Sequence, residues 1–196
     1  MKVKEEQCDL LKYEKELYDK GITLIGGVDE VGRGPLVGPV VAACVILPVN
    51  YELEGLNDSK KLSEKKRDKL YDIIMRDAIS IGIGVVGPEK IDEINILEAS
   101  RLAMKIAIES MDVKPEHVLS DAMKLNNIDI PYTDIIHGDA LSLSIAAGSV
   151  IAKVTRDRMM IELDKEYPEY GFAKHKGYPT KAHVENLVKY GVLENY

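Results

Sequence analysis

The chain has 196 residues, and its 26 basic and 33 acidic residues give a formal net charge of −7. The length suits one domain, the 45% hydrophobic and 30% charged content excludes a largely disordered chain, and two cysteines are too few for a disulfide framework. The acidic balance by itself argues against nucleic-acid binding, because backbone phosphates attract Lys and Arg.

The first half of the chain alternates charged helical patterns with short apolar runs rich in β-branched residues. Residues 5–19 predict a charged helix that Gly21 stops, and Ser63 is suited to be the N-cap of a second helix. Strands are predicted at 22–28, 40–47 and 79–86. Glycines and prolines crowd the link between the first two strands.

The second half continues the alternation. Asn95, followed three residues later by Glu98, resembles the capping box of a long helix. Further helices are predicted at 142–165 and 181–190, and further strands at 118–120 and 133–137. Strands interleaved with helices indicate an α/β domain with a mixed sheet and helices on its faces.

The N-terminal segment and the cysteine content suggest where the protein works. The first 18 residues are charged throughout, unlike a signal peptide, and the longest apolar run, 35–48, is too short to span a bilayer as a helix. With two cysteines, a reducing compartment is the natural interpretation. We therefore expect a cytoplasmic protein without a membrane partner, and nothing in the sequence demands more than a monomer.

The most unusual segment joins two carboxylates to an arginine between glycines. Asp29 and Glu30 end an apolar strand, and Gly32-Arg33-Gly34 follows at once. A charged turn explains this segment equally well when it is taken alone. However, adjacent carboxylates repel each other, and a hard cation such as Mg²⁺ would relieve the repulsion.

Two further aspartates lie at comparable positions. Asp121 ends a predicted strand and Asp139 precedes a predicted helix, so each could be a turn or cap residue. Taken with Asp29 and Glu30, they are four carboxylates that a sheet can gather at one edge. Oxygen ligands without His or Cys suit Mg²⁺ or Mn²⁺, and paired ions of this kind recur in phosphodiester hydrolysis.

Basic residues concentrate in two segments. Residues 57–76 hold seven Lys or Arg against four acids, and residues 171–183 hold three lysines, two histidines and two aromatics without an acid. Aromatics among cations are typical of nucleic-acid contacts, although a mobile basic loop would look the same. Lys153, Arg156 and Arg158 add positive charge, with an ion pair between Arg156 and Asp157 as the alternative.

The motifs resemble those of the ribonuclease HII family, in the family's order over most of residues 22–183. They are DEVGRGPL at 29–36, GPVVAA at 38–43, GLNDSKKLS at 55–63, IDEINIL at 91–97, GD at 138–139, SIAA at 144–147, IAKVTRD at 151–157, YGF at 170–172 and HKGYPT at 175–180.

The resemblance implies an RNase H-like fold, with a central five-stranded mixed sheet, flanking helices and C-terminal helical elements. It divides the chain into an N-terminal helix (1–20), a catalytic domain (21–165) and a C-terminal basic loop and helix that complete the substrate cleft (166–196). The implied activity is endonucleolytic cleavage of RNA in RNA/DNA hybrids and 5′ to single ribonucleotides in duplex DNA. The products carry 3′-hydroxyl and 5′-phosphate ends.

The resemblance also implies roles for particular residues. The catalytic and metal-binding set, holding two Mg²⁺ or Mn²⁺ ions, would be Asp29, Glu30, Asp121 and Asp139. The 2′-hydroxyl of the ribose would be read by Gly32, Arg33 and Gly34, and Tyr178 would pack against the sugar at the RNA-to-DNA junction. Further substrate contacts would come from Asn57, Ser59, Lys60 and Lys153.

Two departures and two alternatives accompany this hypothesis. Asp121 is followed by Ala122 where the family commonly has glycine, and Gly148 stands where it often has alanine. A ribonuclease HIII-like enzyme, which prefers longer RNA tracts, is a close alternative that the Tyr178 motif argues against. A non-catalytic hybrid binder is a distant one, because unneeded carboxylates would repel phosphate.

Overall fold

The computed structural model describes residues 9–56, 62–126 and 128–193. The strands are β1 (Ile25–Val31), β2 (Val40–Ile46), β3 (Ser80–Val86), β4 (His117–Asp121) and β5 (Tyr132–Ile135). The helices are α1 (Lys12–Tyr18), α2 (Glu64–Asp77), α3 (Pro88–Glu109), the 3₁₀ turn η2 (Gly138–Ala140), α4 (Leu143–Glu166), α5 (Phe172–His175) and α6 (Lys181–Tyr190).

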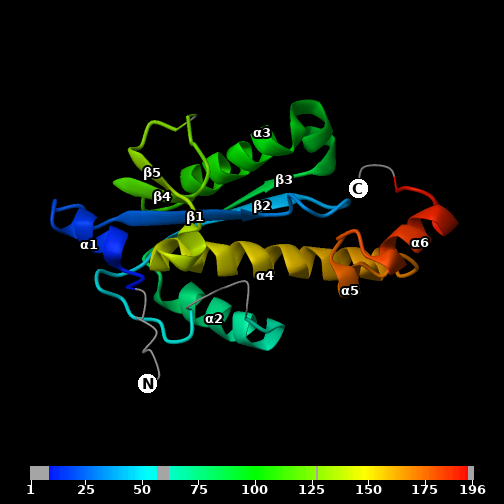
Figure 1. Ribbon diagram of the computed structural model, residues 1–196, viewed down its shortest axis with the longest axis horizontal. Helices are drawn as coiled ribbons and strands as arrows, with labels where there is room; N and C mark the ends of the chain where they lie inside the picture. The colour runs from blue at the N-terminus through cyan, green and yellow to red at the C-terminus, as the bar shows by residue number, and fades with distance from the viewer. Residues whose placement is uncertain (1–8, 57–61, 127, 194–196) are drawn as a thin grey trace, which may run out of the picture.

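The five strands form one mixed sheet in the order β3-β2-β1-β4-β5. The first three strands are antiparallel neighbours, whereas β1, β4 and β5 run parallel. The expected RNase H-like arrangement of a five-stranded mixed sheet between helices is confirmed (Figure 1).

Helices cover both faces of the sheet. In Figure 1, α3 lies on one side of the sheet and α4 on the other, with α2 outside α4. All seven residues of β2 are buried, as expected for a strand covered on both faces. The core is therefore two apolar layers, one between the sheet and α3 and one between the sheet, α4 and α2.

Helix α4 approaches β1 unusually closely. A Cβ atom at Gly27 would lie 2.0 Å from the backbone carbon of Ser144, so only glycine fits there. Gly148 on the helix faces the same contact, because its Cβ would lie 2.8 Å from the Gly27 carbonyl oxygen. This contact brings the first half of α4 against the strand that carries Asp29.

The predicted elements appear, with shifted boundaries. The first strand begins three residues later than expected and includes Asp29 and Glu30, because β1 pairs with β2 as far as Val31. Helix α3 begins at Pro88 and not after Asn95, but Asn95 interrupts it at φ +68°. The Asn95 side chain then accepts hydrogen bonds from two backbone N–H groups, as the predicted cap requires.

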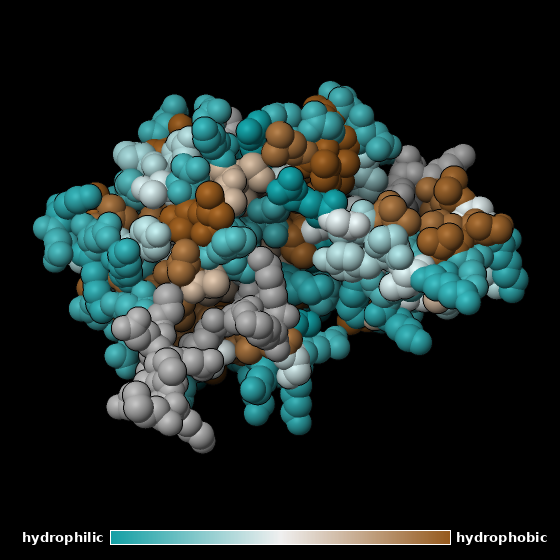
Figure 2. All heavy atoms as spheres, in the orientation of Figure 1, coloured by the Kyte–Doolittle hydropathy of each residue, from teal (hydrophilic) through white to brown (hydrophobic). Residues whose placement is uncertain are grey.

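The C-terminal segment packs against the far end of α4. Its core contains Val37, Met160, Tyr170 and Phe172, and its two helices are α5 and α6 (Figure 1). Hydrophobic side chains also gather on the surface over and just beyond α6 (Figure 2), where the exposed residues are Val184, Val188, Tyr190 and Val192.

Candidate active site

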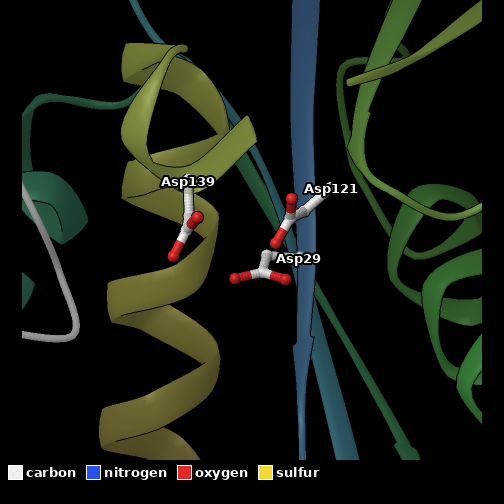
Figure 3. Close-up of side chains that lie close together, drawn as sticks. All are labelled: Asp29, Asp121 and Asp139. Carbon is white, nitrogen blue, oxygen red and sulfur yellow. The ribbon is translucent and has the colours of Figure 1, made fainter. Parts of the chain in front are cut away.

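Three aspartates from distant parts of the chain meet at one edge of the sheet. Asp29 comes from β1, Asp121 from the end of β4 and Asp139 from η2. One carboxylate oxygen of each lies within 4.8 Å of those of the other two. Figure 3 shows their side chains converging beside the start of α4.

Strand register explains why Asp29 and Asp121 meet. Val28 pairs with Ser120 in the parallel β1–β4 ladder, so Asp29 and Asp121 come next on neighbouring strands. Equivalent positions on parallel strands present their side chains to the same face. Both carboxylates therefore face the layer that contains α4.

A hydrogen bond brings Asp139 into the group. The Gly138 N–H donates to Oδ1 of Asp121 at 2.7 Å, which ties η2 to the end of β4. Asp139 is not the helix cap considered from the sequence, because Ser142 fills that position and its hydroxyl accepts from the Ile145 N–H. The buried Asp139 side chain points instead toward the other two aspartates.

The surroundings of Asp29 disfavour the negative charge of its carboxyl group. Burial raises the pKa of Asp29 well above its ordinary value, and the negative charges of Glu30 and Asp121 raise it further. Hydrogen bonds from the Ser149 hydroxyl and the Glu30 N–H act in the opposite direction.

Glu30 lies beside the three aspartates and is not grouped with them. Its carboxylate is not among the three whose oxygens lie within 4.8 Å of one another, but its negative charge still acts on Asp29. Its carboxylate lines the same pocket and lies 3.4 Å from Nη1 of Arg33. Burial raises the pKa of Glu30, although the Arg33 charge offsets part of this effect.

Asp29 and Asp121 line a pocket of about 480 Å³ that contains most of the predicted substrate residues. It is lined by Asp29, Glu30, Val31, Gly32, Arg33, Gly34, Arg67, Asp121, Ser149, Lys153 and Tyr178. The Gly-Arg-Gly turn (residues 32–34) lies directly against the tyrosine, since a Cβ at Gly34 would lie 3.4 Å from the Tyr178 ring. Two motifs separated by more than 140 residues thus form one wall.

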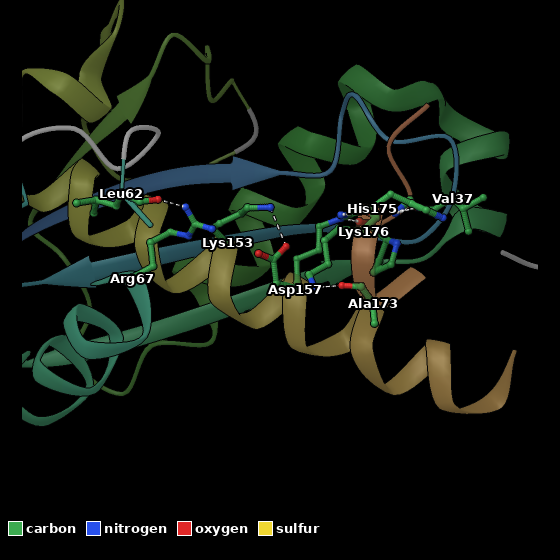
Figure 4. Close-up of polar contacts among 11 residues, drawn as sticks. Val37, Leu62, Arg67, Lys153, Asp157, Ala173, His175 and Lys176 are labelled. Carbon is green, nitrogen blue, oxygen red and sulfur yellow. Dashed lines mark hydrogen bonds and ion pairs between the residues drawn. The ribbon is translucent and has the colours of Figure 1, made fainter. Parts of the chain in front are cut away.

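Cations flank this wall. Lys153 Nζ lies 5.6 Å from the centre of the Tyr178 ring and forms an ion pair with Asp157 at 2.7 Å. Arg67 donates to the Leu62 carbonyl, and Figure 4 shows it on the same side as Lys153. The pocket therefore combines an acidic floor with positively charged sides.

Sequence reasoning missed Arg67 and Ser149 as pocket residues. In the sequence, Arg67 is only one of the cations of the basic excess in 57–76. Ser149 lies within an apolar stretch of α4, where its hydroxyl between Gly148 and Val150 is the only local sign of a polar role. Asn57, Ser59 and Lys60 lie outside the described residues.

The basic segment 171–183 divides into core and surface. Phe172 is fully buried, and the rings of His175 and His183 stack 4.3 Å apart beneath the surface, so these three residues serve packing. Tyr178 is exposed at the pocket. The considered ion pair between Arg156 and Asp157 is wrong, because Arg156 is buried against backbone carbonyls and Asp157 pairs with Lys153.

The aspartate cluster fits a hard divalent cation. Its donors are carboxylate oxygens that lie within reach of a single ion, and two of the three side chains are buried. Mg²⁺ and Mn²⁺ prefer such oxygen ligands, and a cation would offset both the burial and the repulsion that raise the Asp29 pKa.

Comparisons with known proteins agree with the geometry. The family model described as Ribonuclease HII matches residues 26–195. Ribonuclease HII of Bacillus cytotoxicus is 58% identical over 98% of this chain and 74% of its own length, and that of Bacillus cereus (strain B4264) is 56% identical over 100% and 76%. The crystal structure of ribonuclease H2 from Pyrococcus horikoshii OT3 superposes with a TM-score of 0.72 at 27% identity, over 87% of this chain and 90% of that one.

Among the described residues, no helix combines the length and the apolar character needed to cross a bilayer.

Proposed function

The chain belongs to the ribonuclease HII family, and we propose that it cleaves duplex DNA 5′ to a single embedded ribonucleotide with two divalent metal ions. Membership makes it a ribonuclease H, an endoribonuclease that acts on RNA in RNA/DNA hybrids. The main support for cleavage at a single ribonucleotide is that the aspartate cluster lies beside the wall formed by the 32–34 turn and Tyr178.

The aspartates are proposed to hold the ions. Asp29, Asp121 and Asp139 offer the shared oxygen donors, and Glu30 lies at the rim where a second ion could engage it. Divalent ions bound there would supply charge stabilisation at the scissile phosphate. Ser149 orients Asp29 by hydrogen bonding, and Gly138 does the same for Asp121.

The pocket wall is proposed to recognise the ribonucleotide. Gly32 allows the 32–34 turn to pack against the Pro39 carbonyl, and Gly34 brings it against the Tyr178 ring, so that the backbone of the turn lies where it can read a 2′-hydroxyl. The half-exposed Tyr178 ring offers a flat face to the adjoining sugar, and Lys153 above it can meet the phosphate. Asn57, Ser59 and Lys60 remain proposed phosphate contacts.

The deciding assay compares three duplexes in the presence of Mg²⁺ or Mn²⁺. They contain no ribonucleotide, one ribonucleotide, and a run of four. We expect cleavage of the second and third, with a 3′-hydroxyl and a 5′-phosphate at the cut on the 5′ side of the single ribonucleotide. Equal cleavage of the all-DNA duplex, or none of the single-ribonucleotide duplex, contradicts the proposal. Activity confined to the run of four would favour the ribonuclease HIII-like alternative.

Tyr178→Ala tests the sugar contact. The substitution removes the ring that we propose to contact the sugar, so we expect a loss of single-ribonucleotide cleavage. It leaves every carboxylate in place, so Mn²⁺ binding should stay at the level of the unmodified protein. Tyr190→Ala, which removes a half-exposed ring outside the pocket, is the matched control. Unchanged junction cleavage by Tyr178→Ala would rule out this role.

A further inference from the structure

Arg156 on α4 is a charged residue with no exposed surface. Its guanidinium donates to three backbone carbonyls: Nε to Pro39 at 2.9 Å, Nη2 to Val37 at 3.0 Å and Nη1 to Lys176 at 2.9 Å. A buried cation is costly unless its donors are satisfied, and a planar guanidinium satisfies several acceptors only in a fixed geometry. The three carbonyls are therefore held at defined positions relative to α4.

These carbonyls belong to two segments far apart in the sequence. Val37 and Pro39 lie in the connection that follows the 32–34 turn, and Lys176 lies two residues before Tyr178. Figure 4 shows Val37 and Lys176 at the same end of α4. Arg156 thus bridges the two halves of the pocket wall from behind.

The two segments also contact each other directly. The Leu36 N–H donates to the Gly177 carbonyl at 2.9 Å. Gly177 adopts φ +82°, and a Cβ there would lie 2.5 Å from the Val37 carbonyl oxygen. The contact leaves no space between the segments, so displacement of one must move the other.

Short paths connect Arg156 to both recognition elements. Nε of Arg156 lies 3.0 Å from the position of a Cβ at Gly32, the first residue of the 32–34 turn. On the other side, the Tyr178 N–H donates to the His175 carbonyl at 2.9 Å, and the Gly177 N–H donates to Nδ1 of His175 at 3.2 Å. Arg156 holds Lys176 in the middle of this connection.

We propose that Arg156 is a positioning residue that sets the spacing between the 32–34 turn and Tyr178, and thereby the discrimination between RNA and DNA. It does not line the pocket, so it acts through the two segments and not by touching substrate. The inference rests on the proposed function, because that function assigns ribonucleotide recognition to this wall.

A double-mutant cycle tests the inference. Arg156→Met keeps the length and apolar stem of the side chain but removes all three donors. We expect kcat/KM on the single-ribonucleotide duplex to fall by about 100-fold, mainly through kcat, as for a displacement of about 1 Å in a positioning contact. If Arg156 acts through Tyr178, adding Tyr178→Ala to Arg156→Met lowers kcat/KM much less than it does in the unmodified protein.

Control variants separate positioning from general destabilisation. Arg101→Met removes a partly buried arginine from α3, on the other side of the sheet, and is expected to keep the full effect of Tyr178→Ala. Mn²⁺ binding should be unchanged in Arg156→Met, because the aspartate cluster is not touched. If Arg156→Met does not fold, Gly177→Ala, whose Cβ presses against Val37, replaces it in the cycle.

The outcomes distinguish this inference from the proposed function. Failure of the unmodified protein to cleave the single-ribonucleotide duplex overturns the function itself. Normal cleavage by the unmodified protein, together with strictly multiplicative effects of Arg156→Met and Tyr178→Ala, overturns only the positioning role. A reduced effect of Tyr178→Ala in the Arg101→Met background as well would also overturn it, since the coupling would then reflect stability.

Discussion

At the residue scale, Asp29 is suited to bind a cation but lowers the stability of the fold when no metal is bound. Its carboxyl group is buried, and Glu30 and Asp121 repel its charge. The folded pKa is therefore higher than the unfolded one, and the folded state binds more protons between these two values. Stability without metal falls as the pH rises through that window.

Asp29→Asn should therefore have opposite effects on stability and on function. The amide keeps the acceptor for the Glu30 N–H but carries no charge, so the melting temperature in EDTA at neutral pH should rise. Turnover and the stabilisation of the fold by Mn²⁺ should both be lost. Thermal unfolding with EDTA and with Mn²⁺ measures the two effects, and the exposed Asp112→Asn is the control. A lower melting temperature in EDTA than the unmodified protein contradicts this account.

Ala122 stands where the family commonly has glycine, yet Asp121 keeps its position in the cluster. Ala122 adopts φ +49°, the left-handed region in which glycine is favoured, and its N–H donates to the Ile135 carbonyl. The backbone keeps the conformation that a glycine would adopt, so Asp121 still reaches the cluster. The substitution carries strain of roughly 1–2 kcal/mol, because Cβ crowds the following carbonyl oxygen.

Ala122→Gly should accordingly stabilise the protein. Release of the left-handed strain exceeds the added entropy of glycine in the unfolded chain, leaving a net gain of up to about 1 kcal/mol. Denaturant unfolding measures the difference. Ala182→Gly, at an exposed helical position in α6, should instead lose about 1 kcal/mol. Destabilisation by both substitutions would show that the strain is absent.

At the element scale, the N-terminal helix supports the helix that flanks the site. Glu14 on α1 is fully buried and accepts hydrogen bonds from the Ser142 hydroxyl at 2.6 Å and the Ser144 N–H at 3.0 Å. The backbone just before α1 also contributes, because the Leu143 N–H donates to the Leu10 carbonyl. These bonds anchor the N-cap and first turn of α4, which begins four residues after Asp139.

Glu14→Ala tests this link. The substitution leaves a buried hydroxyl and a buried N–H without their acceptor, so we expect a loss of about 2–3 kcal/mol of unfolding free energy. Glu16→Ala, at an exposed position of the same helix, should change stability by less than about 0.5 kcal/mol. Similar stabilities for the two variants in urea unfolding would mean that α1 does not anchor α4.

At the scale of the whole molecule, the distribution of charge matters more than its sum. The net charge is −7, yet residues 87–135 alone contain ten acids and five bases. The pocket gathers Arg33, Arg67 and Lys153 around its acidic floor. An acidic protein can thus present basic side chains to a polyanion, because screening limits charge effects to about 10 Å at 0.1 M salt.

Substrate affinity should therefore depend on salt. Each phosphate contact releases condensed counterions, so the dissociation constant of an uncleaved duplex, measured with Ca²⁺ in place of Mg²⁺, should increase with salt concentration. Arg67→Ala should reduce the slope of log affinity against log salt by about 1. Lys105→Ala on α3, where Lys105 pairs with Glu109, should leave the slope unchanged. Equal slopes for the two variants would show that Arg67 does not contact the substrate phosphates.

Local sequence patterns were enough to predict the strands and helix caps of this protein. Apolar runs bounded by turn residues identified all five strands, and the caps at Ser63 and Asn95 were confirmed because capping depends only on neighbouring residues. Its motifs also determined the family. The carboxylates were recognised as candidates because they stand at or beside the ends of predicted elements.

Contacts between distant segments of the folded chain determine which of these residues lie together in the site. The β1–β4 register grouped Asp29 with Asp121, and Glu30 lies in the same pocket beside them. The close contact of α4 with β1 brought Ser149 to Asp29, and packing at the far end of α4 buried Arg156 while leaving Lys153 in the pocket. Such relations depend on contacts between segments more than 90 residues apart in the chain, which local sequence patterns do not encode.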